Sequence, residues 1–474
     1  VDVAERRQMV AEQVRAAASQ LGGVAVDDQA LIDTVTHLVE MPVALGGRFS
    51  ESFLELPREI LITSMREHQK YFAVSDDQGR LMPCFVAVNN TRPKDTSLVT
   101  RGHERVLKAR LSDAQFFFRA DLQQRMDDRV EKLKGVLFQA KLGSMHDKVM
   151  RVQQVAEQLA KAAAPEQQSL VKRAAYLCKA DLVSHVVGEF ANLQGIMGRV
   201  YAETAGEPPE VCRAIEEHYR PTFSGGPLPQ GMIGALLAVA DKLDTICGCF
   251  SADLMPTGAS DPYALRRQGI GIVQIMLSHN LSFPLREALD FCVACFEMQQ
   301  RQQTAEAVYA FLQQRIAHML IEEGFAKDVV AAVIAVTVDH IPHVWQRARA
   351  LNRLKGMPDF DPLAVAFKRV VNILRKAELT EDSALRPERF TDDAEKALYT
   401  AYRDVSDLVA KYTADGDFGQ ALLTIARLRA PVDRFFDDVM VMAEDDTVRC
   451  NRLALLAVIA ALFQRIADFS KITV

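Results

Sequence analysis

Residues 366–377 read AFKRVVNILRKA, and their apolar side chains recur at intervals of three and four. Phe367, Val370 and Leu374 therefore fall on one stripe of an amphipathic helix, with Val371 beside them. The basic residues fall largely off that stripe, and they are Lys368, Arg369, Arg375 and Lys376. The stretch predicts a helix that packs on one side and carries positive charge on the other.

Further amphipathic stretches follow toward the C-terminus. Residues 421–429 and 431–442 each predict a helix, and Pro431 suits the first turn of the second one. A last helix is expected to begin at Arg449 and to run to about Phe469. Residues 357–474 are therefore predicted to form an all-α domain.

The first part of the chain mixes helix and strand. Residues 4–21 and 101–118 have helical spacing. Residues 71–88 predict a hairpin, because β-rich flanks surround a turn that contains Asp and Gly. Residues 1–135 are predicted to form an α+β portion. We expect this portion to be incomplete at its N-terminus, because the chain opens on a Val within an amphipathic stretch.

The middle of the chain has helical patterns separated by proline-marked loops. Residues 136–300 are predicted to form an all-α domain, and residues 301–356 a helical linker region. The clearest linker is GMPDFDP at 356–362, since its two prolines disfavour helix. The whole sequence therefore predicts a mainly α, multidomain fold.

The charge is distributed unevenly along the chain. The 474 residues carry a formal net charge of −6, so bulk positive charge cannot attract nucleic acid. Between Gln346 and Lys376, however, eight Lys and Arg residues stand against two Asp residues, a local charge of +6. Such contrast suits phosphate binding without global basicity, and it also suits a solvated helix face.

Cysteine content and hydropathy indicate the cellular compartment in which the chain is expected. Eight cysteines in a chain of this length form no disulfide framework and fit a reducing cytosol, so a cytoplasmic location is expected. No segment reaches the roughly 18 uninterrupted apolar residues of a membrane span. We therefore expect no membrane partner.

Several unusual strings resemble segments of one family. In chain order they are LPREI at 56–60, REHQKYF at 66–72, GHERVLKARLSDAQFFF at 102–118, KADL at 179–182, LQGIMGRVYA at 193–202, DPYALRR at 261–267, FFDDVMVM at 435–442 and NRLALL at 451–456. They are similar to the beta subunit of the bacterial two-subunit glycyl-tRNA synthetases. Together the matching segments run in one order from about residue 39 to 469.

The resemblance implies a role for the C-terminal domain. That domain looks like the helical anticodon-binding domain of the arginyl-tRNA synthetase type, which implies contact with the anticodon arm of a tRNA. The implied RNA-binding candidates there are Lys368, Arg369, Arg375, Lys376, Arg427, Arg429, Arg449 and Arg452. The last two have an alternative structural role, beside the acidic residues 444–446.

Two further basic groups are candidates for RNA contact. Asp261 and Pro262 predict a helix start, with Arg266 and Arg267 close behind. These arginines could clamp a phosphate, or Asp261 could cap the helix while one Arg pairs with a carboxylate. The second group is a basic stripe formed by Arg101, Arg105 and Lys108.

The middle domain is similar to the HD phosphohydrolases, which bind a divalent metal. His146 begins a helix, and a later apolar helix ends near Asp241. At the place of the central His-Asp pair stand Cys178 and Lys179, and a lysine offers a metal no lone pair while it is charged. His218 completes this degenerate set. We therefore expect an HD-like scaffold without a metal, and a working metal-dependent phosphohydrolase is the alternative.

The resemblance also implies the division of labour in the enzyme. By this resemblance, no catalytic residue and no bound cofactor are expected on this chain. In keeping with that, we recognise no phosphate-cradling glycine-rich loop in it. ATP and Mg²⁺ are expected on a separate alpha subunit. The expected partners are that subunit, in an α₂β₂ heterotetramer, and tRNA(Gly). A weaker option is an RNA-binding protein with no ligase partner.

Overall fold

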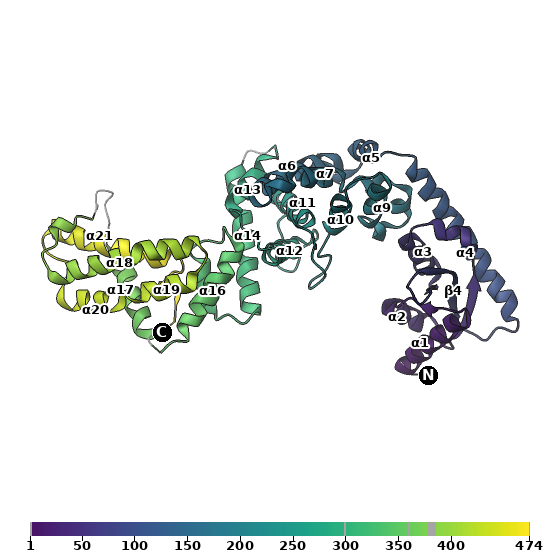
Figure 1. The fold of residues 1–474 in the computed structure, drawn as a ribbon, viewed down its shortest axis with the longest axis horizontal. Helices are drawn as coiled ribbons and strands as arrows, with labels where there is room; N and C mark the ends of the chain where they lie inside the picture. Colours follow the sequence, from purple (N-terminus) through teal and green to yellow (C-terminus); the bar gives the residue numbers. More distant parts are fainter. Residues whose placement is uncertain (1, 298–299, 359, 378–384, 474) are drawn as a thin grey trace. The chain divides into compact units, whose positions relative to one another are not determined.

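The computed structural model describes residues 2–297, 300–358, 360–377 and 385–473. They form two compact units (Figure 1): unit 1 comprises residues 1–153 and 169–219, and unit 2 comprises residues 154–168 and 220–474. Helices dominate both, which confirms the mainly α, multidomain prediction. The four domains predicted from the sequence divide the chain more finely and stay a prediction.

Unit 1 begins with a four-stranded antiparallel sheet of order β1-β3-β4-β2. The predicted hairpin is confirmed, and Asp76 closes its turn by accepting from the backbone amides of Gln78 and Arg80. The strands are β1 (Val24–Ala25), β2 (Val43–Arg48), β3 (Phe72–Ser75) and β4 (Leu81–Asn89).

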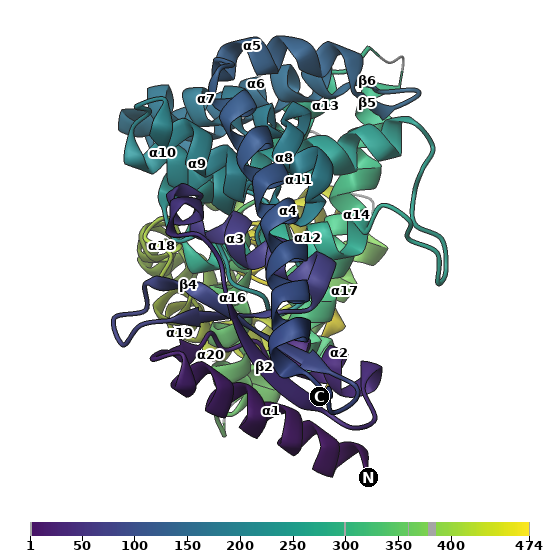
Figure 2. The ribbon, with the colours of Figure 1, turned by 90° about the vertical axis from the view of Figure 1, so that its right-hand side faces the viewer.

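Helices cover both faces of this sheet (Figure 2). Successive side chains of β4 point to opposite faces, so each face has apolar residues that a helix can bury. Cys84 and Val86 join the core formed with α1 (Val3–Gln20) and α2 (Gln29–Leu38). Phe85 stacks on Tyr71, whose hydroxyl lies 2.7 Å from His103 Nδ1 on α4. The helices near this second face are α3 (Arg58–Ser64), continued by a π-helical turn at Met65–Gln69, and α4 (Thr96–Leu122).

The rest of unit 1 is a group of short helices after α4. Asp121, at the end of α4, accepts from the backbone amides of His185 (2.9 Å) and Val186 (3.1 Å) and from the Tyr201 hydroxyl (2.7 Å). This buried carboxylate therefore ties α4 to two later helices. The elements are α5 (Met126–Lys132), β5 (Leu137–Gln139), β6 (Gly143–Ser144), α6 (Met145–Ala163), α7 (Gln168–Leu177), α8 (His185–Glu189), α9 (Ile196–Thr204) and α10 (Pro209–Glu217).

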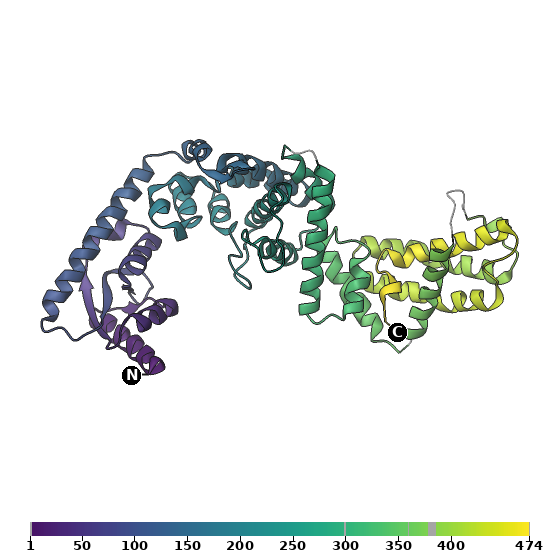
Figure 3. The same ribbon diagram turned by 180° about the vertical axis from the view of Figure 1, so that it is seen from behind.

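Unit 2 is built mainly of helices (Figure 3). Phe367 is fully buried in it, with its ring 4.4 Å from that of Phe463. Its helices after α6 are α11 (Met232–Ser251), α12 (Leu265–Ser278), α13 (Leu285–Ala294), α14 (Arg301–Glu322), α15 (Lys327–Ile334), α16 (Ile341–Lys355), α17 (Phe360–Lys376), α18 (Asp393–Ala414), α19 (Phe418–Ala426), α20 (Arg429–Asp438) and α21 (Asp446–Gln464). None of the helices in the described part of the chain is long and apolar enough to span a membrane.

Several predicted boundaries were wrong. The linker at 356–362 is shorter than expected, because α17 already begins at Phe360 and contains Pro362 in its first turn. A proline is tolerated there, since first-turn amides have no acceptor within the helix. The helix α20 ends at Asp438, short of 442, and α21 runs from Asp446 to Gln464. The start of α12 lies at Leu265, four residues after Asp261.

Candidate nucleic-acid interface

The helix α17 presents the basic face that its sequence predicts. Phe367 and Val370 are buried, whereas Arg369, Arg375 and Lys376 are exposed and Lys368 is half-buried. The Arg369 guanidinium carbon lies 4.3 Å from the centroid of the Phe436 ring. This cation–π contact holds one charge in a fixed place on the exposed face.

Some of the cations in the predicted local charge of +6 bind acceptors within unit 2. Arg347 is buried and donates to the carbonyl oxygens of Thr337 and Ile466 (3.4 Å). Lys355 donates to Asp328 Oδ2 at 2.5 Å. Arg349 and Arg353 are exposed. The charge available to a phosphate is therefore smaller than the sequence count suggests.

The two candidates around the end of α19 differ in their surroundings. Arg427 is exposed at the C-terminus of that helix. Arg429 is half-buried, and its Nε lies 3.6 Å from Asp433 Oδ2 one turn later in α20. Arg427 is thus the better placed of the two to meet a ligand from solvent.

The candidates on α21 have protein partners. Arg449 pairs with Asp446 and donates to the Ala443 carbonyl oxygen at 3.0 Å. Arg452 Nε donates to Glu395 Oε1 at 2.7 Å, and its Nη1 donates to the Met440 carbonyl oxygen at 2.8 Å. These contacts favour the structural role that the sequence left open.

The segment DPYALRR forms the start of α12. Asp261 accepts from the backbone amides of Leu265 (2.8 Å) and Arg266 (2.9 Å), as its capping alternative predicts. Arg267 is exposed and Arg266 half-buried. Arg266 also lies close to Arg315, and burial together with this neighbouring charge lowers the pKa of the Arg315 guanidinium. The Asp261 carboxylate acts in the opposite direction on Arg315, so an anion is already present at this helix start.

The predicted stripe on α4 is exposed. Arg101, Arg105 and Lys108 face solvent, whereas Leu107 and Leu111 are buried on the opposite side. All three cations lie within about two turns, so one stretch of phosphate backbone can meet them together. None of these three side chains has a hydrogen bond or an ion pair with another residue in the described part of the chain.

A buried polar chain beside this stripe was not singled out from the sequence. His103 Nε2 lies 3.0 Å from Asn89 Oδ1, and its Nδ1 lies 2.7 Å from the Tyr71 hydroxyl. Burial raises the pKa of Tyr71 to about 12 and lowers the pKa of His103. No sequence signal links positions 71, 89 and 103, because they meet only where α4 packs beside the sheet.

The residues of the degenerate HD set are engaged with other protein groups. Lys179 Nζ lies 2.7 Å from His218 Nε2 and 3.9 Å from the centroid of the Tyr219 ring. His146 Nε2 lies 3.8 Å from Glu131 Oε1, and the Cys178 thiol donates to the Ala175 carbonyl oxygen. Those residues belong to unit 1, whereas Asp241 lies on α11 of unit 2. Among the residues that the structure describes, no group of three or more His, Cys, Asp and Glu side chains could hold a metal ion.

Comparisons with known proteins cover nearly all of the chain. Residues 1–335 match the family described as glycyl-tRNA synthetase beta subunit, and residues 363–473 match the DALR anticodon binding domain. The glycine–tRNA ligase beta subunit of Desulforapulum autotrophicum is 51% identical over 99% of this chain and 69% of its own length. Those of Desulfatibacillum aliphaticivorans and Geotalea uraniireducens are 50% and 47% identical, each over 100% of this chain and 69% of its own length. The chain therefore belongs to the glycyl-tRNA synthetase beta subunit family and carries a DALR anticodon binding domain at residues 363–473.

Proposed function

We propose that this chain is the tRNA-binding subunit of a glycine–tRNA ligase, and that it positions tRNA(Gly) for aminoacylation on a separate alpha subunit. The observation that carries the proposal is the exposed basic face of α17 within the segment that matches an anticodon binding domain. A helix face of this kind neutralises backbone phosphates, and a positioned tRNA reacts at a lower entropic cost.

The assembly and its cofactors are part of the same proposal. The chain joins the alpha subunit in an α₂β₂ heterotetramer, and ATP and Mg²⁺ act on the alpha subunit. A cytoplasmic location fits both the family and the eight cysteines, which are all free thiols. The phosphohydrolase alternative has no supporting observation, because Lys179 and His218 are bound to each other.

The first test is aminoacylation of tRNA(Gly) with radiolabelled glycine, with and without an added alpha subunit. We expect product only when both chains are present. We also expect no ATP–pyrophosphate exchange from this chain alone. Exchange by this chain alone would place glycine activation here and would contradict the proposal.

The second test reverses the charge of the α17 face. The variant Lys368→Glu/Arg369→Glu/Arg375→Glu/Lys376→Glu should bind tRNA more weakly and with a shallower dependence of log K on log salt, because fewer counterions are released.

A matched control reverses four exposed cations on the same domain, at Lys396, Arg403, Lys411 and Arg434. Three of them lie on α18, where acidic neighbours such as Asp404 and Asp407 dilute their charge. Equal losses of tRNA affinity in the two variants would mean that α17 is not the anticodon contact.

A further inference from the structure

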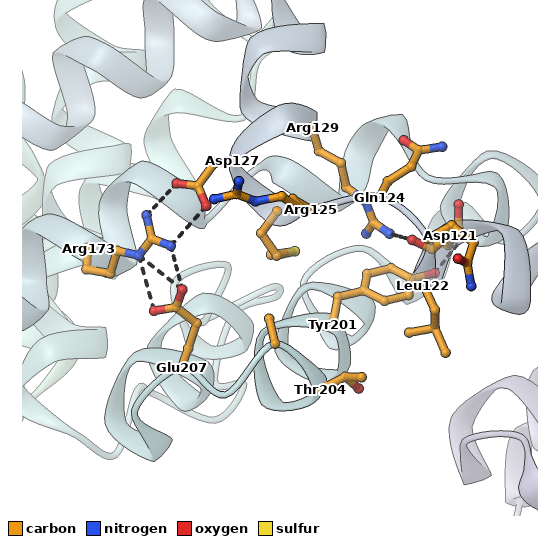
Figure 4. A pocket seen from close by; sticks show the side chains of 13 residues that line it. Asp121, Leu122, Gln124, Arg125, Asp127, Arg129, Arg173, Tyr201, Thr204 and Glu207 are labelled. Atoms are coloured by element: carbon orange, nitrogen blue, oxygen red, sulfur yellow. Dashed lines mark hydrogen bonds and ion pairs between the residues drawn. The ribbon is translucent and has the colours of Figure 1, made fainter.

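A pocket of about 450 Å³ lies in unit 1 where α4 ends, at α5, α7 and α9 (Figure 4). Its walls carry three arginines, Arg125, Arg129 and Arg173, and three carboxylates, Asp121, Asp127 and Glu207. The sequence singled out none of these residues as a candidate for RNA binding or catalysis. Which of these charged groups can bind a ligand depends on which of them already have protein partners.

All three carboxylates are engaged by the protein. Arg173 makes a fork to both Asp127 Oδ1 (2.8 Å) and Glu207 Oε1 (2.5 Å), as the dashed lines in Figure 4 show. Asp121 accepts from His185, Val186 and Tyr201. Burial by itself would raise the pKa of Asp121, but these hydrogen bonds outweigh burial and lower that pKa. All three carboxylates of the pocket therefore already accept hydrogen bonds from the protein.

The arginines of the pocket, in contrast, include one whose hydrogen-bond donors are only partly used. Arg129 is only 1% exposed, and its guanidinium lies 4.0 Å from the centroid of the Tyr201 ring. One of its nitrogens donates to the Asp121 carbonyl oxygen, but Nε and Nη1 are buried without any hydrogen-bond partner. A buried charged group with unmade hydrogen bonds is costly, so it strongly favours an acceptor.

A second cation lies at the mouth of the same pocket. Arg125 is exposed, and it lies close enough to Asp127 to contribute to the lowered pKa of that carboxyl. Because Asp127 is already held by Arg173, an anion between Arg125 and Arg129 would meet two guanidinium groups. Neither has a hydrogen bond or an ion pair to a carboxylate in the described part of the chain, although the Asp121 and Asp181 charges also act on Arg129. Thr204 and Gln124 add polar groups to the wall.

We propose that this pocket binds a phosphate group, with Arg129 as its buried anchor and Arg125 at its rim. Guanidinium groups match the oxygens of a phosphate, and the volume leaves room for a nucleoside attached to it. The phosphate comes either from a terminal phosphate of RNA or from a free mononucleotide. The site lies outside the anticodon binding domain and needs no alpha subunit, so it goes beyond the proposed function.

The test begins with inorganic phosphate and the full chain, without RNA. Phosphate should raise the melting temperature in a saturable way, whereas sodium chloride of equal ionic strength should not, since a ligand of the native state stabilises it by mass action. Titration calorimetry should give a stoichiometry of one. Stabilisation equal to that by chloride would overturn the proposal.

Two variants and one control locate the site. Arg125→Gln should weaken phosphate binding about tenfold, the effect of losing one charge-assisted hydrogen bond. Arg129→Gln should weaken phosphate binding further. If Arg129→Gln does not fold, the measurement on Arg125→Gln still tests the proposal. The control Arg213→Gln removes an exposed arginine from α10 of the same unit, outside the pocket, and should bind phosphate as the parent does. Equal binding by Arg125→Gln and Arg213→Gln would overturn the proposal.

Competition then separates the two sources of phosphate. Displacement of phosphate by AMP, but not by adenosine, would assign the pocket to a mononucleotide. Displacement only by 5′-phosphorylated tRNA, and not by the same tRNA with a 5′-hydroxyl, would assign it to the RNA end. Both results support the phosphate site. Loss of tRNA binding in the α17 variant with unchanged phosphate binding would show that the two sites are separate.

Discussion

At the scale of single residues, the arginines fall into two groups that the sequence does not distinguish. Arg347 and Arg452 are held by acceptors far along the chain, whereas Arg427 is exposed at a helix end. A buried guanidinium with protein acceptors stabilises the fold, and an exposed one is available to a phosphate. The same residue type therefore serves two purposes within unit 2.

Replacing Arg452 should destabilise unit 2. Glu395 is 1% exposed, so Arg452→Gln leaves a buried carboxylate without its cation, at a cost of roughly 3 kcal/mol. The control Arg427→Gln, at an exposed site, should change stability by less than about 0.5 kcal/mol. Urea denaturation measures both, and equal midpoints for the two variants would show that the Arg452 pair does not stabilise the domain.

His103 should make unit 1 less stable in acid. Because burial lowers its pKa in the folded state, its contribution is fully present above the unfolded pKa of about 6.5 and is lost as pH falls through the folded value. Urea denaturation at pH 7 and pH 5 should therefore show a smaller loss of stability for His103→Gln than for the parent. Carboxylates contribute to the loss between pH 7 and pH 5 equally in both proteins, so they cancel in the comparison. Identical losses of unfolding free energy in the two proteins would rule out the His103 contribution.

At the scale of elements, side-chain caps mark where several of the helices begin. Aspartates cap several helices through their side chains, among them Asp28, Asp95, Asp392 and Asp445. Asp392 forms a capping box with Glu395, the residue that also binds Arg452. The start of α18 is thus coupled to the position of α21 within the bundle.

The start of α12 should depend on the Asp261 carboxylate. Asp261→Ala leaves two backbone amides without acceptors and should cost about 1–2 kcal/mol. Asp261→Asn keeps one acceptor oxygen, so its loss should be smaller. The free energies of unfolding in urea test this order, and equal losses for Asn and Ala would show that the two hydrogen bonds do not hold this helix start.

At the scale of the whole molecule, each unit has its own buried core. In unit 1, Phe85 is fully buried, and a Cβ at Gly47 would lie 2.4 Å from Phe85 Cζ, so this glycine leaves space for the ring. In unit 2, the rings of Phe367, Phe463 and Phe469 pack together. Two independent cores predict that the chain does not unfold in a single two-state step.

Core substitutions should therefore shift separate transitions. Phe85→Ala should lower the stability of unit 1 and Phe367→Ala that of unit 2, each by about 3–5 kcal/mol. Differential scanning calorimetry should show each variant moving a different transition. If both variants shifted the same single transition equally, the chain would unfold as one cooperative body.

The sequence by itself determined the helices, the hairpin, the acidic net charge and the family, because these depend on local periodicity and on strings of neighbouring residues. It also predicted the basic faces of α4 and α17, since helical spacing places those charges on one side. Only the tertiary structure decided which cations stay available. Arg347 meets an acceptor 119 residues away, and Arg129 is enclosed with two nitrogens lacking partners. Hydrogen-bond partners remote in sequence meet only when the chain packs, so no local pattern carries that information.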